Sequence, residues 1–457
     1  MLNIKQRLLL LTFLSAGIVT LPSLGRAQSF IEEPPIAYSE TADNNRVSKL
    51  IKTINSGETT LDYDRETGYL KSFLAALEIP VSSQVLVFSK TSMQFKYISP
   101  RNPRAIYFND DTYVGWVQGS SLMEVSTNDP KLGAAFYSIK MHPDKARIKR
   151  ELYTCLACHT SPMTQGVPGH TVRSVTPKAD GTIDAQGESF VTDHSSPFEQ
   201  RWGGWYITGQ IGDMKHMGNA ILRGSELAAI VESNQNELQH KFHVDRWLTP
   251  HSDIVALLVL EHQTQMQNAF TVADFTVRRA IYDHEQSKSS SRESETRKQT
   301  TASDEADKEI EYAINQAAKK VVDYMLFVNE APITSEITSS TTFAVDFSRR
   351  GPADKMGRSL RDFNLRNRMF EYPCSYLIYS PAFESLQPRL RAAIYRQLWN
   401  VLSEDNPADE YHHLSATTRL AILEIILATK KNLPDYWTAK ATHPQTSATT
   451  YSRRSDS

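Results

Sequence analysis

The sequence predicts an α+β fold, in which an N-terminal antiparallel β-rich unit is followed by a mainly helical C-terminal half. Residues 84–139 contain short runs rich in Val, Ile, Tyr and Phe that are separated by turn-forming Asn, Asp, Gly and Pro. Residues 253–270 and 309–325 instead carry apolar side chains at helical spacing. The intervening residues 284–307 are charged and serine-rich, which predicts a flexible connection between two helices.

The first 27 residues have the organisation of a secretory signal peptide. Lys5 and Arg7 precede an apolar run from residue 8 to residue 21, and Gly25 and Ala27 are the small residues expected before a cleavage site. An uncleaved membrane anchor is the alternative, but the apolar run is shorter than the roughly 20 residues that span a bilayer. We therefore expect cleavage after Ala27 and a periplasmic or secreted protein.

The mature chain is mildly acidic. The signal segment carries three basic residues and no acidic one, so its removal changes the formal net charge from −2 to −5. Nucleic-acid binding needs clustered Lys and Arg, so this charge disfavours nucleic acid as a partner. No later stretch approaches 18 consecutive apolar residues, so we expect no membrane span in the mature chain.

The β-rich unit is expected over residues 61–252, after an irregular N-terminal segment at 28–60. A helix at residues 68–79, which Pro80 ends, should precede the strands. Six strands are predicted from β-branched and aromatic runs: Gln84–Ser89, Phe95–Ile98, Ala105–Phe108, Tyr113–Val117, Leu122–Ser126 and Ala134–Ile139.

The helical half is expected over residues 253–437, and a disordered tail over 438–457. Asp253 is placed to cap the first helix, which runs to Phe270. Helix resumes near Glu309 after the flexible segment 284–307, and later helices are predicted at 388–402 and 416–428. The third cysteine of the chain, Cys374, should be a buried thiol.

The function depends on the stretch Cys155-Leu156-Ala157-Cys158-His159, which has the C-x-x-C-H pattern of a c-type haem attachment site. Cys155 and Cys158 would form thioethers with the porphyrin, and His159 would ligate the iron on the proximal side. A redox dithiol and half of a zinc site are the alternatives. The zinc hypothesis needs further ligands, and Cys374 is distant and no histidine pair follows at finger spacing.

Two further residues are candidates for contact with the haem. Arg173 follows the glycine- and proline-rich loop after the motif, and its guanidinium could pair with a propionate. Trp202 stands beside two glycines, where an indole can pack on porphyrin or donate to a propionate. A surface arginine and a core tryptophan are the ordinary alternatives.

The sixth ligand of the iron stays open among several side chains. The segment 209–219 contains Met214, His216 and Met217, and small c-type cytochromes often take a methionine from such a downstream loop. His170 lies shortly after the motif, and His262 lies within the apolar helix. For His262, a buried and hydrogen-bonded histidine is the commoner alternative.

Several long stretches resemble a family of exported bacterial proteins described as cytochrome c domain-containing. This resemblance implies haem c and export but no particular reaction, and it favours His216 as the sixth ligand, since a histidine is expected two residues before a Gly-Asn pair. Where that family pattern has a His-Asn pair near the end of the first long helix, this chain has Gln267-Asn268, which weakens a metal role for that helix. The resemblance covers roughly residues 60–437 and is carried by Ile79–Ser92, Arg104–Trp116, Cys155–His159 with Gly166–Ser174, Arg201–Gly209, Leu260–Gln263 and Gly357–Ser380.

The sequence therefore favours an electron-transfer protein with one covalent haem and a redox partner protein. A haem enzyme of peroxidase or oxidase type is the second hypothesis, and it would need an acid or base such as His216, His194 or His170 near the iron. A haem-bearing sensor or scaffold is the third, because the chain is far longer than one haem requires.

Overall fold

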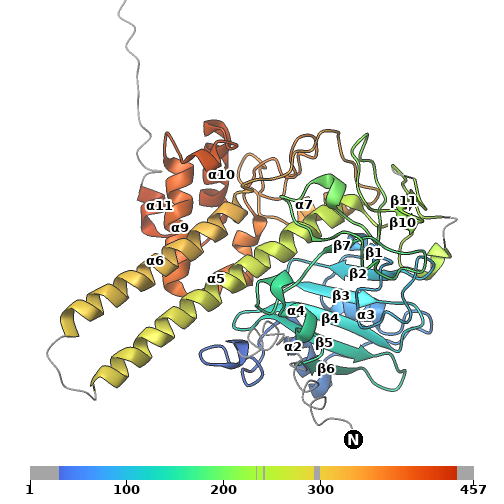
Figure 1. Cartoon of the computed structure of the whole chain (residues 1–457), viewed down its shortest axis with the longest axis horizontal. Helices are drawn as coiled ribbons and strands as arrows, with labels where there is room; N and C mark the ends of the chain where they lie inside the picture. The colour runs from blue at the N-terminus through green and yellow to red at the C-terminus, as the bar shows by residue number, and fades with distance from the viewer. Residues whose placement is uncertain (1–29, 233, 240–241, 293–298, 440–457) are drawn as a thin grey trace, which may run out of the picture.

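The computed structural model describes residues 30–232, 234–239, 242–292 and 299–439. It confirms the predicted α+β class, because the N-terminal half forms a seven-stranded antiparallel sheet and the C-terminal half is mainly helical (Figure 1). The predicted signal peptide lies outside the described residues, and so does the predicted tail except for its first two residues. Among the described helices, none is both long and apolar enough to cross a membrane.

The large sheet has the strand order β6-β5-β4-β3-β2-β1-β9. Consecutive strands from β1 to β6 pair as an antiparallel meander, and β9 arrives from downstream to pair with β1. The strands are β1 (Val85–Val87), β2 (Arg104–Phe108), β3 (Thr112–Trp116), β4 (Leu122–Asp129), β5 (Gly133–Lys140), β6 (Arg147–Glu151) and β9 (Trp205–Tyr206).

Five of the six predicted strands are present, and the prediction of a strand at Phe95–Ile98 is wrong. This segment forms turns, in which Ser92 accepts hydrogen bonds from the backbone N–H of Gln94 on its hydroxyl and of Phe95 on its carbonyl. A serine that bonds its own following backbone favours a turn over a strand. Strand β6 was not predicted, because its charged residues show none of the apolar pattern of a buried strand.

The two faces of the sheet are covered by different elements. One face packs against α2 (Arg46–Ser56) and α3 (Leu70–Ala76), and the opposite face packs against the long helix α5 (Ile254–Arg292). Helix α2 corrects the expectation of an irregular segment at 28–60. It begins with a reciprocal pair of hydrogen bonds, in which the Asn45 and Ser48 side chains each accept from the other residue's backbone N–H.

Helices α5 and α6 (Gln299–Met325) form a long antiparallel hairpin that projects from the body of the protein (Figure 1). Asp253 caps α5 as predicted, because its Oδ1 accepts from the N–H groups of Val255 and Ala256. The helices extend into most of the segment 284–307 that was expected to be flexible, and residues 293–298 lie outside the described part. Helix propagation from a packed segment costs little, and the two helices are joined at Asp307, which pairs with Lys288 and lies 3.1 Å from the His284 ring.

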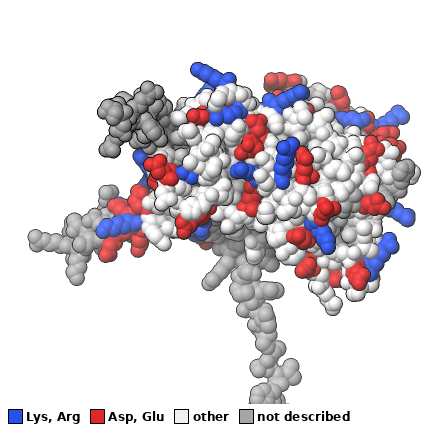
Figure 2. Space-filling view, turned by 90° about the horizontal axis from the view of Figure 1, so that it is seen from above, with Lys and Arg blue, Asp and Glu red and all other residues white. Residues whose placement is uncertain are grey.

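The helices that follow α6 pack around this hairpin (Figure 1). The two helices predicted at 388–402 and 416–428 are confirmed as α9 and α10, and Cys374 is a buried free thiol as expected. Acidic and basic side chains are interspersed on the face seen in Figure 2. The other elements are α4 (Leu156–His159), α7 (Phe343–Arg349), α8 (Pro381–Glu384), α9 (Pro388–Ser403), α10 (Ala416–Thr429), α11 (Asp435–Ala439), β7 (Arg173–Val175), β8 (Ser189–Val191), β10 (Ala220–Arg223) and β11 (Glu226–Ala229).

Candidate functional site

The motif residues form a single helical turn, in which Cys155 caps helix α4 (Leu156–His159). The backbone N–H of His159 donates to the carbonyl of Cys155 at 3.0 Å, so the residues i, i+3 and i+4 of this turn share one face. Both thiols are free, with Cys155 half-buried and Cys158 exposed. The local fold therefore places Cys155, Cys158 and His159 side by side, as the sequence predicts.

The imidazole of His159 is oriented by a second backbone contact. Its Nδ1 lies 2.8 Å from the carbonyl oxygen of Gly169, and a carbonyl can only accept, so Nδ1 carries the proton. The other ring nitrogen, Nε2, then keeps its lone pair. The ring also packs against Phe136 of β5, with 4.7 Å between ring centroids. A metal-binding histidine is commonly held in this way by a carbonyl that fixes its tautomer.

These residues line a cavity of about 430 Å³ on the α5 side of the sheet. A volume of this size lies within the range of small-molecule and cofactor sites. Strands β2 to β5, the loop before β7 and two residues of α5 contribute its other walls. Its lining includes Lys90, Met93, Arg104, Ile106, Tyr113, Gly115, Glu124, Ser126, Phe136, His170, Arg173, Trp205, Leu260 and Thr264.

A redox dithiol finds little support at this site. Burial, followed by the nearby Glu124 carboxylate, raises the pKa of the Cys155 thiol to about 12, whereas a redox dithiol needs a lowered thiol pKa. In the described part of the chain, no group of three or more His, Cys, Asp and Glu side chains is placed to hold a metal ion.

His170 lies in the same cavity, and neither of its ring nitrogens has a hydrogen-bond partner among the described residues. Only 5% of the residue is exposed, and burial lowers the pKa of its imidazole to about 3. The ring packs on Tyr113 with 4.5 Å between centroids. Its backbone N–H and carbonyl are both bonded to the side chain of Asn268 on α5. His170 is thus firmly positioned, with a neutral imidazole that has no protein partner.

An ion pair also lines the cavity. Arg104 of β2 lies 2.6 Å from Glu124 of β4, and the hydroxyl of Ser92 donates to the same carboxylate at 3.2 Å. The guanidinium crosses the intervening strand at Gly115, where an added Cβ would lie only 2.1 Å from an Arg104 nitrogen. Glycine inside a strand often marks such a close approach. This pair was not predicted, although Gly115 interrupts an otherwise bulky strand.

Of the two further haem-contact candidates, the structure brings only Arg173 to the cavity. Its Nε donates to the hydroxyl of Ser189, and the residue is partly exposed. Trp202 instead lies fully in the core, packed edge-on against Phe198. The neighbouring Trp205 lines the cavity and donates from its indole N–H to the carbonyl of Arg173. The structure therefore places Trp205, rather than Trp202, at the cavity.

Four of the five candidates for the sixth ligand lie away from the cavity lining. The Met214 sulfur accepts from the backbone of Thr334 at 3.4 Å, and the Met217 sulfur accepts from Ser174 at 3.7 Å. The His262 and His194 rings bond each other through their Nδ1 atoms at 3.0 Å, and His262 Nε2 also contacts the Ser375 hydroxyl at 2.8 Å.

The favoured candidate, His216, packs edge-on against Trp202 with 5.7 Å between ring centroids. The next residues are held in the core, because Asn219 bonds both backbone groups of Ile207. The segment 209–219 is thereby fixed away from the motif, and the structure does not bring His216 to the cavity.

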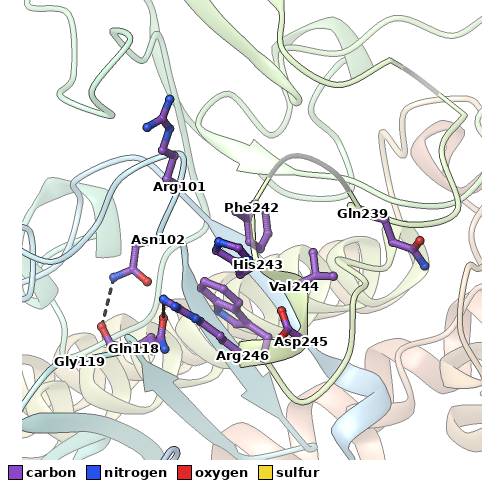
Figure 3. Close-up of a pocket in the computed structure, with 11 residues that line it drawn as sticks. Arg101, Asn102, Gln118, Gly119, Gln239, Phe242, His243, Val244, Asp245 and Arg246 are labelled. Atoms are coloured by element: carbon purple, nitrogen blue, oxygen red, sulfur yellow. Dashed lines mark hydrogen bonds between the residues drawn. The ribbon is translucent and has the colours of Figure 1, made fainter.

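A larger and more open hollow of about 1020 Å³ is lined by none of the motif residues (Figure 3). It includes Arg101, Asn102 and His243, and Arg246 donates to the side chain of Gln118 at 3.4 Å. This hollow shows no contact with Cys155, Cys158 or His159, so the candidate site is the smaller cavity.

Comparisons with family models, with curated proteins and with solved structures each find no match to this chain.

Proposed function

We propose that the cavity holds one covalently attached c-type haem and that the protein is an exported electron-transfer protein. The observation that carries this proposal is the arrangement of His159. Its Nδ1–H is bonded to Gly169, so its Nε2 keeps the lone pair that a metal would use, and both thiols of the motif stand on the same helical turn. The resemblance to exported cytochrome c domain-containing proteins and the predicted signal peptide agree with this assignment.

The two cysteines would attach the group by thioether formation. Each thiol would add across one vinyl group, forming one carbon–sulfur bond while its proton goes to the other vinyl carbon, so the addition is redox-neutral. Spacing of three residues on a helical turn places both sulfurs on one face of α4. When bound, the haem supplies one-electron exchange between Fe(III) and Fe(II).

The lining of the cavity offers both apolar and charged groups to a porphyrin. Ile106, Trp205 and Leu260 offer apolar contacts for the ring. Arg173, which is partly exposed, would pair with a propionate, since guanidinium geometry suits a carboxylate. The remaining task of the protein would be to bury the iron and set its potential for a redox partner protein.

A haem enzyme of peroxidase type is the second candidate, and the Arg104–Glu124 pair is the observation that favours it. A carboxylate beside a guanidinium could move a proton to or from a small oxidant such as peroxide. This function needs an open coordination position on the iron. It is therefore excluded if a protein side chain ligates the sixth position.

A redox spectrum tests the proposed function. The chain should be expressed with its export signal and with c-type haem maturation enzymes, and its absorbance recorded in the oxidised and reduced states. We expect the sharp bands of a reduced c-type haem, fully reversible on reoxidation. The variant Cys155→Ser with Cys158→Ser should lack them, and a wild-type spectrum without haem bands would refute the proposal.

A further inference from the structure

The imidazole of His170 is buried in the cavity, where its two ring nitrogens lack, among the described residues, the hydrogen bonds that buried polar atoms normally make. Both ring nitrogens are buried, and neither has a hydrogen-bond partner in the described part of the chain. A buried polar group without a partner costs about 1–3 kcal/mol, and it is retained only where something compensates. The side chain faces the cavity that also contains Cys155, Cys158 and His159.

We infer that His170 is the second axial ligand, so that the haem iron is held between the imidazoles of His159 and His170. This inference rests on the proposed function, because it requires haem in the cavity. Coordination would use one ring nitrogen of His170 as the ligand. It would therefore explain why a polar ring is buried at this position without a protein partner.

The dipeptide Gly169-His170 contributes to both proposed ligands. The carbonyl of Gly169 fixes the tautomer of His159, and the next residue is His170 itself. The backbone of Gly169 also donates from its N–H to the carbonyl of His159 at 3.0 Å. An added Cβ at Gly169 would lie 2.4 Å from Asn268 Oδ1, so glycine permits this close contact with α5.

The backbone of His170 is anchored to α5 on both sides. Asn268 Oδ1 accepts from the N–H of His170 at 2.9 Å, and Asn268 Nδ2 donates to its carbonyl at 2.7 Å. Tyr113 packs against the ring, and its hydroxyl is in turn bonded to Gln263 and Gln267. A ligand whose backbone and ring are both fixed is preorganised for coordination.

The competing ligands are less suited to the position. His216, Met214, Met217 and His262 pack elsewhere, as described above. Lys90 lines the cavity, but its ammonium is paired with Asp180 at 3.0 Å. Met93 also lines the cavity and carries a thioether, but it is 48% exposed on a turn. Met93 is therefore the competitor that the experiment must separate from His170.

Ligation by two imidazoles predicts a defined electronic state. The iron should be low-spin, and its potential should be low because the thioether that raises haem potentials is absent. A six-coordinate iron also leaves no position for peroxide, so this inference favours electron transfer over the peroxidase hypothesis.

Electron paramagnetic resonance and absorbance of the oxidised protein test the inference on four variants. His170→Ala should convert the low-spin wild-type signal to high-spin, and added imidazole should restore the low-spin signal. His170→Met should show the far-red charge-transfer band of a thioether-bound iron. The matched controls Met93→Leu and His216→Ala should keep the wild-type spectrum.

The outcomes separate this inference from the proposed function. Haem that stays covalently attached while His170→Ala remains low-spin, or a wild type that is high-spin, would overturn the assignment of His170 alone. Conversion to high-spin by Met93→Leu would assign Met93 instead and would also overturn it. A wild-type chain without covalent haem would overturn the proposed function and this inference together.

Discussion

The side chain of Asn268 bonds both backbone groups of His170, accepting from its N–H at 2.9 Å and donating to its carbonyl at 2.7 Å. The two residues are 98 positions apart in the chain. A helix of the C-terminal half therefore fixes a loop that belongs to the β-rich half. The candidate site is consequently a product of both halves rather than of the β-rich unit alone.

Replacing Asn268 with Ala should lower the free energy of unfolding by about 2–4 kcal/mol, because two buried backbone groups lose their partners. Denaturant unfolding measures this change. Thr276→Ala is the matched control, since Thr276 lies exposed on the same helix and should change stability by less than about 0.5 kcal/mol. An Asn268→Ala protein as stable as this control would show that the contact contributes little.

Replacing Gly115 with Ala should disrupt the ion pair of Arg104 and Glu124. The new methyl group would occupy the space of the guanidinium, and overpacking of this kind costs about 1–3 kcal/mol. Chemical unfolding in a double-mutant cycle provides the control. In an Arg104→Ala background the same glycine substitution should cost much less, and equal costs in both backgrounds would contradict the proposed contact.

The buried histidine pair should make the fold sensitive to acid. Burial lowers the pKa of His194 to about 4 and that of His262 well below its usual value. Between about pH 4 and pH 6.5 the unfolded chain binds protons at these rings while the folded chain does not. The free energy of unfolding should therefore fall as the pH falls below 6.5, by about 1.4 kcal/mol per pH unit for each ring.

Unfolding free energies measured across this pH range should report the protonation of both imidazoles. In the variant His194→Gln with His262→Gln, the free energy of unfolding should fall less steeply below pH 6.5. The difference should be about 1.4 kcal/mol per pH unit for each of the two rings removed. Above pH 7.5 the variant and the wild type should run parallel, because the rings are neutral in both states. Identical slopes below pH 6.5 would show that these rings do not govern the acid response.

Loss of both motif cysteines should destabilise the protein as well as remove its redox activity. Apolar side chains of the loop from Cys155 to residue 174 would pack against the haem. Loss of the haem would therefore expose these side chains to water. The expected loss is about 3–6 kcal/mol, comparable to exposing two large side chains. Thermal unfolding of wild type against the Cys155→Ser, Cys158→Ser variant measures it, and an unchanged melting temperature would argue against haem as a structural element.

The sequence predicted those features that depend on neighbouring residues. Alternating apolar runs located five strands, and the spacing of Cys155, Cys158 and His159 located one side of the cavity. Features that depend on distant contacts were missed. Phe95–Ile98 has strand-like composition, but the bonds of Ser92 make it a turn, and the polar segment 284–307 is helical over most of its length because two helices support each other.

The same distinction applies to the sixth ligand. His216 is preceded and followed by methionines in a glycine-rich segment, which resembles a ligand loop, but the fold packs it against Trp202. His170 has no such local pattern, and its role depends on Asn268 across the two halves of the chain. Only the folded structure shows that the His170 ring is buried in the cavity with no hydrogen-bond partner in the described part of the chain.

The measurement that tests the central claim most directly is the intact mass of the purified, denatured chain. Denaturation removes any group that is held only by contacts, whereas thioethers at Cys155 and Cys158 survive it. The proposed function predicts a mass increased by one haem for the wild type and no increase for the Cys155→Ser, Cys158→Ser variant. A wild-type mass equal to that of the polypeptide alone, from cells with active c-type maturation, would contradict it.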